Sequence, residues 1–516
     1  MFVGGFDYPA ERHTMTTRNL SADLSAITRF RLSRTHLVIL FAAFAGAVFA
    51  FYRLTGLTSQ FLRSESGAFL LYGINVTPPG YTDSYQYLTS SMFGHFTPVA
   101  FYFEMLQARL IGTRELAWFA RSIALVCFLA GLVGAYVARA ASMETRPAYG
   151  LGMVAAILFV MQPVMPDMIS WPFMALQLEC SALGLAGALF LVRYAQDARP
   201  RDLWLALGLA YLSMHFLGVG LAFSLAALGA ATLVLLLQGA VPARFAPILV
   251  FGLLTLGHAV KMAGGGGGLE SKPINAVAGK IVLRTLAMAW GMLKSGSLSL
   301  TAADSGLQFS YGTALREKAV YGAGWLTILA ICLVLLVVRF RRTLAREDLV
   351  TLVTIALPML FCLANSLLVA WRNASAQFPG EIYFDAFFVV PRYVFFSSLC
   401  VIMLAPGLAR LLRPDMRVVG YAAPVVAMTA IVSNLFFMTS DIRTVEPMLF
   451  LSHRAVWKNV LGETRVALAE GRAIPNLART DLGEFAFQPR NFEALIREEL
   501  KVGEGAPPFV WEDNPE

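Results

Sequence analysis

The feature that most constrains this chain is the recurrence of apolar runs long enough to cross a lipid bilayer. About 20 apolar residues in a helix cross the hydrocarbon core, where only helices and closed barrels satisfy every backbone polar group. Of the 516 residues, 57% are hydrophobic and 14% are charged, whereas soluble domains carry about 25% charged residues. We therefore predict an all-α polytopic membrane protein. Eleven spans are predicted, at residues 36–53, 121–139, 147–164, 172–193, 203–218, 220–238, 245–262, 319–338, 348–370, 393–411 and 417–437.

Basic residues concentrate in short loops between these spans, and the net charge is +8. Short loops rich in Lys and Arg stay in the cytoplasm. Their alternation along the chain predicts a cytoplasmic N-terminal segment at 1–35, a transmembrane domain at 36–437 and an extracytoplasmic C-terminal tail at 438–516. Since the loops account for the positive charge, we expect no nucleic-acid partner. The arginine-rich loops are 138–146, 193–202, 239–244, 339–346 and 410–417.

Two predicted outer segments, 54–120 and 263–318, are longer than a simple connection requires. Within the first, the stretch 96–111 is short and carries Glu104 and Arg109. We interpret it as an interfacial or re-entrant amphipathic helix and not as a twelfth span. Interfacial solvation explains its charges as well as a functional role does. In the second, residues 281–293 are apolar enough to lie against the membrane. The polar tail contains possible helices near 446–470 and 491–502.

The first outer loop carries a recognisable order of residues. An acidic residue follows the first span, then come Gly94-His95-Phe96-Thr97-Pro98, an aromatic amphipathic stretch, Gly112, and Arg121 at the next span. Over roughly residues 36–262 this order resembles the GT-C superfamily of membrane glycosyltransferases, similar to the protein O-mannosyltransferases and the aminoarabinose transferases. A weaker match lies at Pro391-Arg392-Tyr393.

The resemblance implies a GT-C-like fold and a sugar donor linked to polyprenyl phosphate. The sugar would pass with inversion to an acceptor hydroxyl on a glycan, lipid or protein. Together with the arginine-rich loops, the resemblance indicates a bacterial inner membrane with the active site on its outer, periplasmic face. Family members carry an Asp just after the first span, whereas this chain has Ser64-Glu65 there.

Carboxylates of the first outer loop are the candidate catalytic groups. An acceptor hydroxyl is a poor nucleophile, and a base within hydrogen-bond reach accelerates its attack by about 10²–10⁴. From its place in the motif, Glu65 is the first candidate for this base and Asp83 is the second. Either acid is also compatible with a solvated loop position. Asp167 matches the superfamily's second acidic position, where it would bind a metal or the acceptor, or only cap the following helix.

Release of the lipid phosphate requires positive charge or hydrogen-bond donors on the outer face. The substrate-binding candidates are His95, Arg392, Lys272, Lys280 and Arg284. His95 would contact the phosphate, orient the base, or only fix the start of the following helix. No motif fixes a cofactor, because acids and histidines are not clustered at metal-ligand spacing, although a divalent metal stays possible.

Two other functional classes stay open. Glu179 lies about two turns inside a predicted span, where a charge is costly, so we predict an interior partner or a bound proton. Such a residue also fits a lipid or saccharide transporter, but the paired broken helices typical of transporters are not evident. A non-catalytic envelope assembly protein is the other alternative, since Glu65 replaces the usual Asp. Trp171 is interpreted as an aromatic anchor at the membrane interface, with stacking on a sugar as the alternative.

Overall fold

The computed structural model describes residues 34–63, 66–67, 69–70, 96–141, 146–264, 274–301, 315–375, 391–412, 416–440, 447–479, 486–503 and 505–512. Residues 1–50 and residues 51–516 form two separate compact units. Helix α2 (Arg34–Leu54) begins in the first unit and ends in the second, and the contacts described below are all within the second unit.

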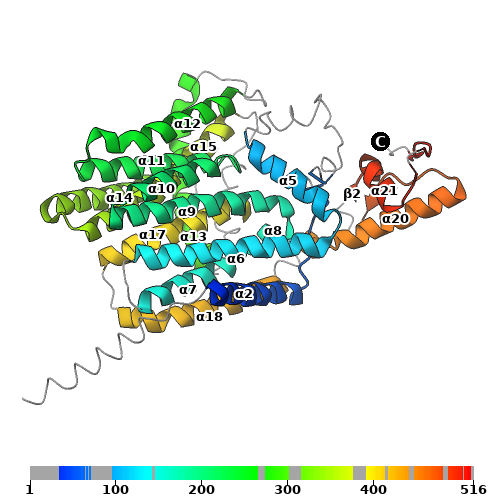
Figure 1. Ribbon diagram of the computed structural model, residues 1–516, viewed down its shortest axis with the longest axis horizontal. Helices are drawn as coiled ribbons and strands as arrows, with labels where there is room; N and C mark the ends of the chain where they lie inside the picture. Colours follow the sequence, from blue (N-terminus) through cyan, green and yellow to red (C-terminus); the bar gives the residue numbers. More distant parts are fainter. Residues whose placement is uncertain are drawn as a thin grey trace, which may run out of the picture. The chain divides into compact units, whose positions relative to one another are not determined.

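Helices make up nearly all of the described chain (Figure 1). The α-helices after α2 are α5 (Pro98–Ile111), α6 (Glu115–Ala140), α7 (Arg146–Val160), α8 (Met165–Ser170), α9 (Ala175–Asp197), α10 (Pro200–Ser213), α11 (Gly220–Leu237), α12 (Ala246–Gly264), α13 (Ile274–Thr301), α14 (Leu315–Thr343), α15 (Arg346–Ser375), α17 (Pro391–Leu412), α18 (Met416–Ser440), α20 (His453–Glu470) and α21 (Glu493–Glu499). The 3₁₀ helices are η1 (Pro172–Met174), η2 (Pro242–Phe245), η3 (Pro447–Phe450) and η4 (Pro489–Phe492). Strands β1 (Ala478–Arg479) and β2 (Ala486–Phe487) pair antiparallel.

Seven of the described helices are long and apolar enough to cross a membrane, which supports the predicted class of helical membrane protein. They are Glu115–Ala140, Pro172–Asp197, Gly220–Leu237, Pro242–Met262, Arg316–Thr343, Arg346–Trp371 and Val394–Leu411. Three shorter apolar helices are Val38–Leu54, Ala148–Val160 and Val425–Phe436. Each of the eleven predicted spans overlaps a helix of the structure, while the number that crosses the bilayer stays a prediction.

Helix α13 lies within the second predicted outer segment, 263–318, and packs in a way that the sequence did not predict. It is a 28-residue helix that packs against α14, α15 and α17. Glycines allow this close packing: a side chain at Gly296 would clash with the Ser397 carbonyl oxygen, and one at Gly322 would clash with the Leu286 carbonyl oxygen. Because this segment carries several basic residues, its sequence did not predict a helix that packs against three other helices.

The arginine-rich loops gather at one end of the helical bundle. Helices α6 and α9 are parallel, because Arg121 lies beside Glu179 near their starts and Arg139 beside Asp197 near their ends. Three further contacts lie at the end of the bundle where α6 and α9 end. They are Arg346 with the Gln196 carbonyl oxygen (3.2 Å), Arg410 with the Ala140 carbonyl oxygen (3.3 Å) and Arg339 with Asp348 (3.0 Å). This end, the arginine end, collects basic loops that are far apart in the sequence. Which side of a membrane it faces stays a prediction.

The C-terminal segment, which is the described chain from residue 447 to residue 512, packs against α5 and against the first loop, which here means the described residues between α2 and residue 70. They share one hydrophobic core, which includes Phe61, Phe69, Phe101, Trp118, Trp457, Val460, Phe492, Ile496 and Phe509. Helices α20 and α21 lie where the tail was predicted to be helical. Because Trp118 lies in the first turn of α6, this core belongs to the end of the bundle opposite the arginine end.

Candidate functional site

The first loop is anchored on α8 and η1 by three hydrogen bonds. The Gln60 N–H donates to the Ser170 carbonyl oxygen (2.7 Å), and the Phe173 N–H donates to the Ser66 hydroxyl (2.9 Å). Between them, Arg63 Nη1 donates to Asp167 Oδ1 (3.2 Å). The chain before residues 64–65 is therefore bonded to α8, which carries Asp167, and the chain after them is bonded to η1.

The Arg63 guanidinium also contacts an aromatic ring and an amide. Its carbon lies 4.1 Å from the centroid of the Trp171 ring, a cation–π distance. The same Nη1 donates to Gln60 Oε1 (2.7 Å). Trp171 is only 6% exposed, so the expectation of an interfacial anchor was wrong: the ring supports Arg63 inside the protein.

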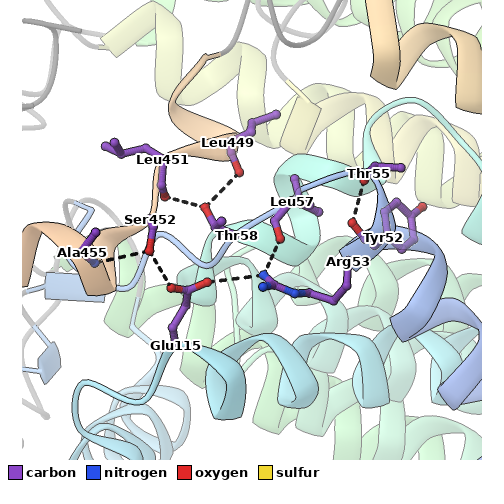
Figure 2. A network of polar contacts seen from close by, with 10 residues as sticks. All are labelled: Tyr52, Arg53, Thr55, Leu57, Thr58, Glu115, Leu449, Leu451, Ser452 and Ala455. Carbon is purple, nitrogen blue, oxygen red and sulfur yellow. Dashed lines mark hydrogen bonds and ion pairs between the residues drawn. The ribbon is translucent and has the colours of Figure 1, made fainter. Parts of the chain in front are cut away.

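Glu115, in the first turn of α6, is shared by two donors (Figure 2). Arg53 Nη1 lies 3.4 Å from Glu115 Oε1, and the Ser452 hydroxyl donates to Glu115 Oε2 (3.0 Å). Ser452 is also the N-cap of α20 and accepts from the Ala455 N–H (3.3 Å). One carboxylate thus joins the end of α2, the start of α6 and the start of α20.

The first loop is bonded to the C-terminal segment as well. The Thr58 N–H donates to the Leu449 carbonyl oxygen (3.2 Å). The Thr58 hydroxyl contacts the carbonyl oxygens of Leu449 and Leu451 (Figure 2). The Leu62 N–H donates to His453 Nδ1 (3.1 Å). Burial, and then the charge of Arg63, lower the pKa of His453 to about 3. His453 is therefore a neutral hydrogen-bond acceptor at neutral pH.

A second ionic group lies between α5, α6 and α9. Both terminal nitrogens of Arg121 contact the Glu104 carboxylate, with Nη1 at 3.2 Å from Oε2, while Nη2 lies 3.8 Å from Glu179 Oε1. The exposed fractions of the side chains of Glu104, Arg121 and Glu179 are 2%, 10% and 17%. The expected partner of Glu179 is present, but Glu104 is buried and not solvated at an interface. Sequence reasoning missed this group because spacing along the chain does not reveal a contact between three helices.

The predicted site residues are brought together only in part. Asp167 reaches the first loop through Arg63, and Arg284 is half-buried on α13. Lys280 and Arg392 lie on α13 and α17, but their side chains are outside the description. Glu65, Asp83, His95 and Lys272 lie outside the described residues. In the described part of the chain, no three His, Cys, Asp or Glu side chains are placed to hold a metal ion.

Comparisons with family models, with curated proteins and with solved structures find no match to this chain. Three buried or half-buried ionic groups lie at this end of the bundle. They are Arg63–Asp167, Arg53–Glu115 and Glu104–Arg121–Glu179.

Proposed function

We propose that this protein is a membrane glycosyltransferase that moves a sugar from a polyprenyl-phosphate carrier to an acceptor hydroxyl. The reaction takes place at the end of the bundle opposite the arginine end. The observation that supports this most is the anchoring of the first loop by Arg63 and Ser66, on both sides of residues 64–65, to the helices beside Asp167. The described residues that flank the candidate base in the sequence are thereby bonded near Asp167, the second acidic position of the GT-C pattern.

The proposed chemistry is a direct displacement. The acceptor oxygen attacks the anomeric carbon from the face opposite the phosphate, and the bond between that carbon and the phosphate oxygen breaks. The bonding electrons leave with the lipid phosphate, and the acceptor proton passes to a carboxylate. Glu65 is the proposed base and Asp83 the second candidate. Asp167 is paired with Arg63, so we assign it the task of fixing the loop.

The departing phosphate gains charge as its bond to the sugar breaks, and cationic groups would stabilise it. Arg392, Lys272, Lys280, Arg284 and His95 are the proposed contributors. The acceptor is a glycan, a lipid or a protein, and the proposed location is the outer side of a bacterial inner membrane. The buried Glu179 is the one observation that favours the transporter alternative.

The test compares Glu65→Gln and Asp83→Asn with the wild-type protein at equal expression in membranes supplied with polyprenyl-phosphate-linked sugar. Glu470→Gln is the matched control, since that acid is 57% exposed on the last turn of α20. We expect one loop variant to abolish transfer while carrier binding persists, and the control to stay active. Full transfer by both loop variants would remove the base assignment.

Two outcomes with the wild-type protein would favour the alternatives. Binding of the carrier without any turnover would favour a non-catalytic assembly protein. Movement of the intact sugar-carrying lipid between the leaflets of reconstituted vesicles, without transfer, would favour a transporter.

A further inference from the structure

The charges of the Glu104–Arg121–Glu179 group do not balance if both carboxyls are ionised. Two carboxylates and one guanidinium carry a net charge of −1, in side chains that are at most 17% exposed. An unbalanced buried charge costs several kcal/mol, and proteins usually avoid that cost by changing a protonation state. One proton on the group would make it neutral.

No other described cation compensates the group. Helix α5 contributes Glu104, α6 contributes Arg121 and α9 contributes Glu179. Among the described side chains, Arg121 alone lies within ion-pair distance of either carboxylate. The nearest other acid along α6, Glu115, is bonded to Arg53 and Ser452.

The geometry indicates which carboxyl holds the proton. Glu104 faces both terminal nitrogens of the guanidinium, the two-point arrangement of an ionised carboxylate with arginine. Glu179 approaches one of these nitrogens through a single oxygen at 3.8 Å. Its other oxygen, Oε2, is buried and has no hydrogen-bond partner among the described residues. A proton on Oε2 would remove the charge from the less well paired carboxyl.

We propose that Glu104, Arg121 and Glu179 form a proton-binding site, in which Glu179 is a neutral carboxylic acid at neutral pH. The site is independent of the proposed sugar transfer, since it follows from charge and contact alone. Loss of the proton gives Arg121 two ionised partners on different helices. The ion pair between Arg121 and Glu104 then weakens. Because Glu104 lies on α5 and Arg121 on α6, proton release is linked to the attachment of α5 to the bundle.

Infrared difference spectroscopy on the purified full chain in lipid nanodiscs tests this directly. A protonated carboxyl has a carbonyl stretch that is separate from carboxylate bands and shifts in heavy water. We expect the wild-type protein to show one such band that disappears in Glu179→Gln. It should also disappear in Glu104→Gln, because Glu179 then becomes the sole partner of Arg121 and ionises. The exposed Glu470→Gln is the control and should keep the band.

The midpoint of thermal unfolding distinguishes the role of Glu104 from that of Glu179 without an activity measurement. Glu179→Gln keeps the Glu104–Arg121 pair, so its midpoint of unfolding should equal or exceed that of the wild-type protein. Glu104→Gln leaves Arg121 only the longer contact, so its midpoint should fall. A wild-type spectrum without the band, a band that survives in Glu179→Gln, or the reverse order of midpoints would overturn the proposal.

Discussion

At the scale of single residues, His453 shows how burial fixes the charge state of a side chain. It is fully buried, accepts a hydrogen bond from the Leu62 N–H and stands near Arg63. Protonation would remove that acceptor and place a second positive charge beside Arg63. The contact between the first loop and the C-terminal segment therefore depends on the neutral imidazole.

Acid should weaken the folded protein through this histidine. The pKa of His453 falls from an ordinary value near 6.5 in the unfolded chain to about 3 in the fold. Above pH 6.5 the imidazole is neutral in both the folded and the unfolded chain, so this histidine does not change the free energy of unfolding with pH there. As the pH falls from 6.5 towards 3, the unfolded chain binds the proton first. The free energy of unfolding then drops by up to about 1.4 kcal/mol per pH unit.

The measurement is the thermal midpoint in detergent as a function of pH, for the wild-type protein and for His453→Asn. The asparagine oxygen can replace Nδ1 as acceptor but does not titrate. We expect the variant to be less stable at neutral pH and to have a flatter profile between pH 6.5 and 3. If the thermal midpoints of the two proteins fall in parallel with pH, groups other than His453 control the loss of stability in acid.

At the scale of helices, hydrophobic length predicted where most helices lie but not how one of them packs. The long apolar segments gave α6, α9, α11, α14, α15 and α17 within a few residues of the expected spans. Helix α13 carries Lys280, Arg284 and Lys294, so its composition indicated an outer segment. Its place beside α14, α15 and α17 depends on glycines that let backbones approach, and hydropathy does not report this.

The close contact of α13 with α17 should make Gly296 intolerant of a side chain. In Gly296→Ala the new methyl group would meet the Ser397 carbonyl oxygen, so the helices must separate. We expect a loss of about 1–3 kcal/mol in the free energy of unfolding. Gly324→Ala on α14 is the control, because a Cβ atom at that position would meet no atom of another segment within 4 Å. It should be neutral, or stabilising by up to about 1 kcal/mol from helix propensity.

Denaturant-induced unfolding in mixed micelles compares the two variants on the same scale. Equal stabilities for Gly296→Ala and Gly324→Ala would contradict the close α13–α17 contact.

At the scale of the whole second unit, the bundle has two chemically different ends. One end collects the arginine-rich loops, and the other collects the first loop, α5 and the C-terminal segment. Loop charge predicted this division, and contacts between distant parts of the chain, such as Arg410 with Ala140 and Ser452 with Glu115, are consistent with it. The orientation in the membrane stays a prediction, made from the rule that basic loops stay inside.

Labelling of single introduced cysteines tests this orientation. Arg201 lies at the arginine end, and Arg472 follows α20 at the other end; both side chains are well exposed, at 68% and 45%. We expect a membrane-impermeant thiol reagent to label Arg472→Cys on intact cells and Arg201→Cys only after the membrane is opened. The wild-type protein gives the background of its native cysteines, four of them buried. Labelling of both variants from one side would rule out the proposed topology.

The sequence by itself determined the helical class, the approximate helix positions and the segregation of basic loops, because hydrophobic length and loop charge are local properties of the chain. It also predicted that Glu179 needs a partner, since a lone charge inside a span is costly. Only the tertiary structure decided that this partner is Arg121, shared with Glu104, and that Arg63 joins the first loop to Asp167. Contacts between residues that are tens of positions apart depend on how helices pack, and no local pattern in the sequence encodes that choice.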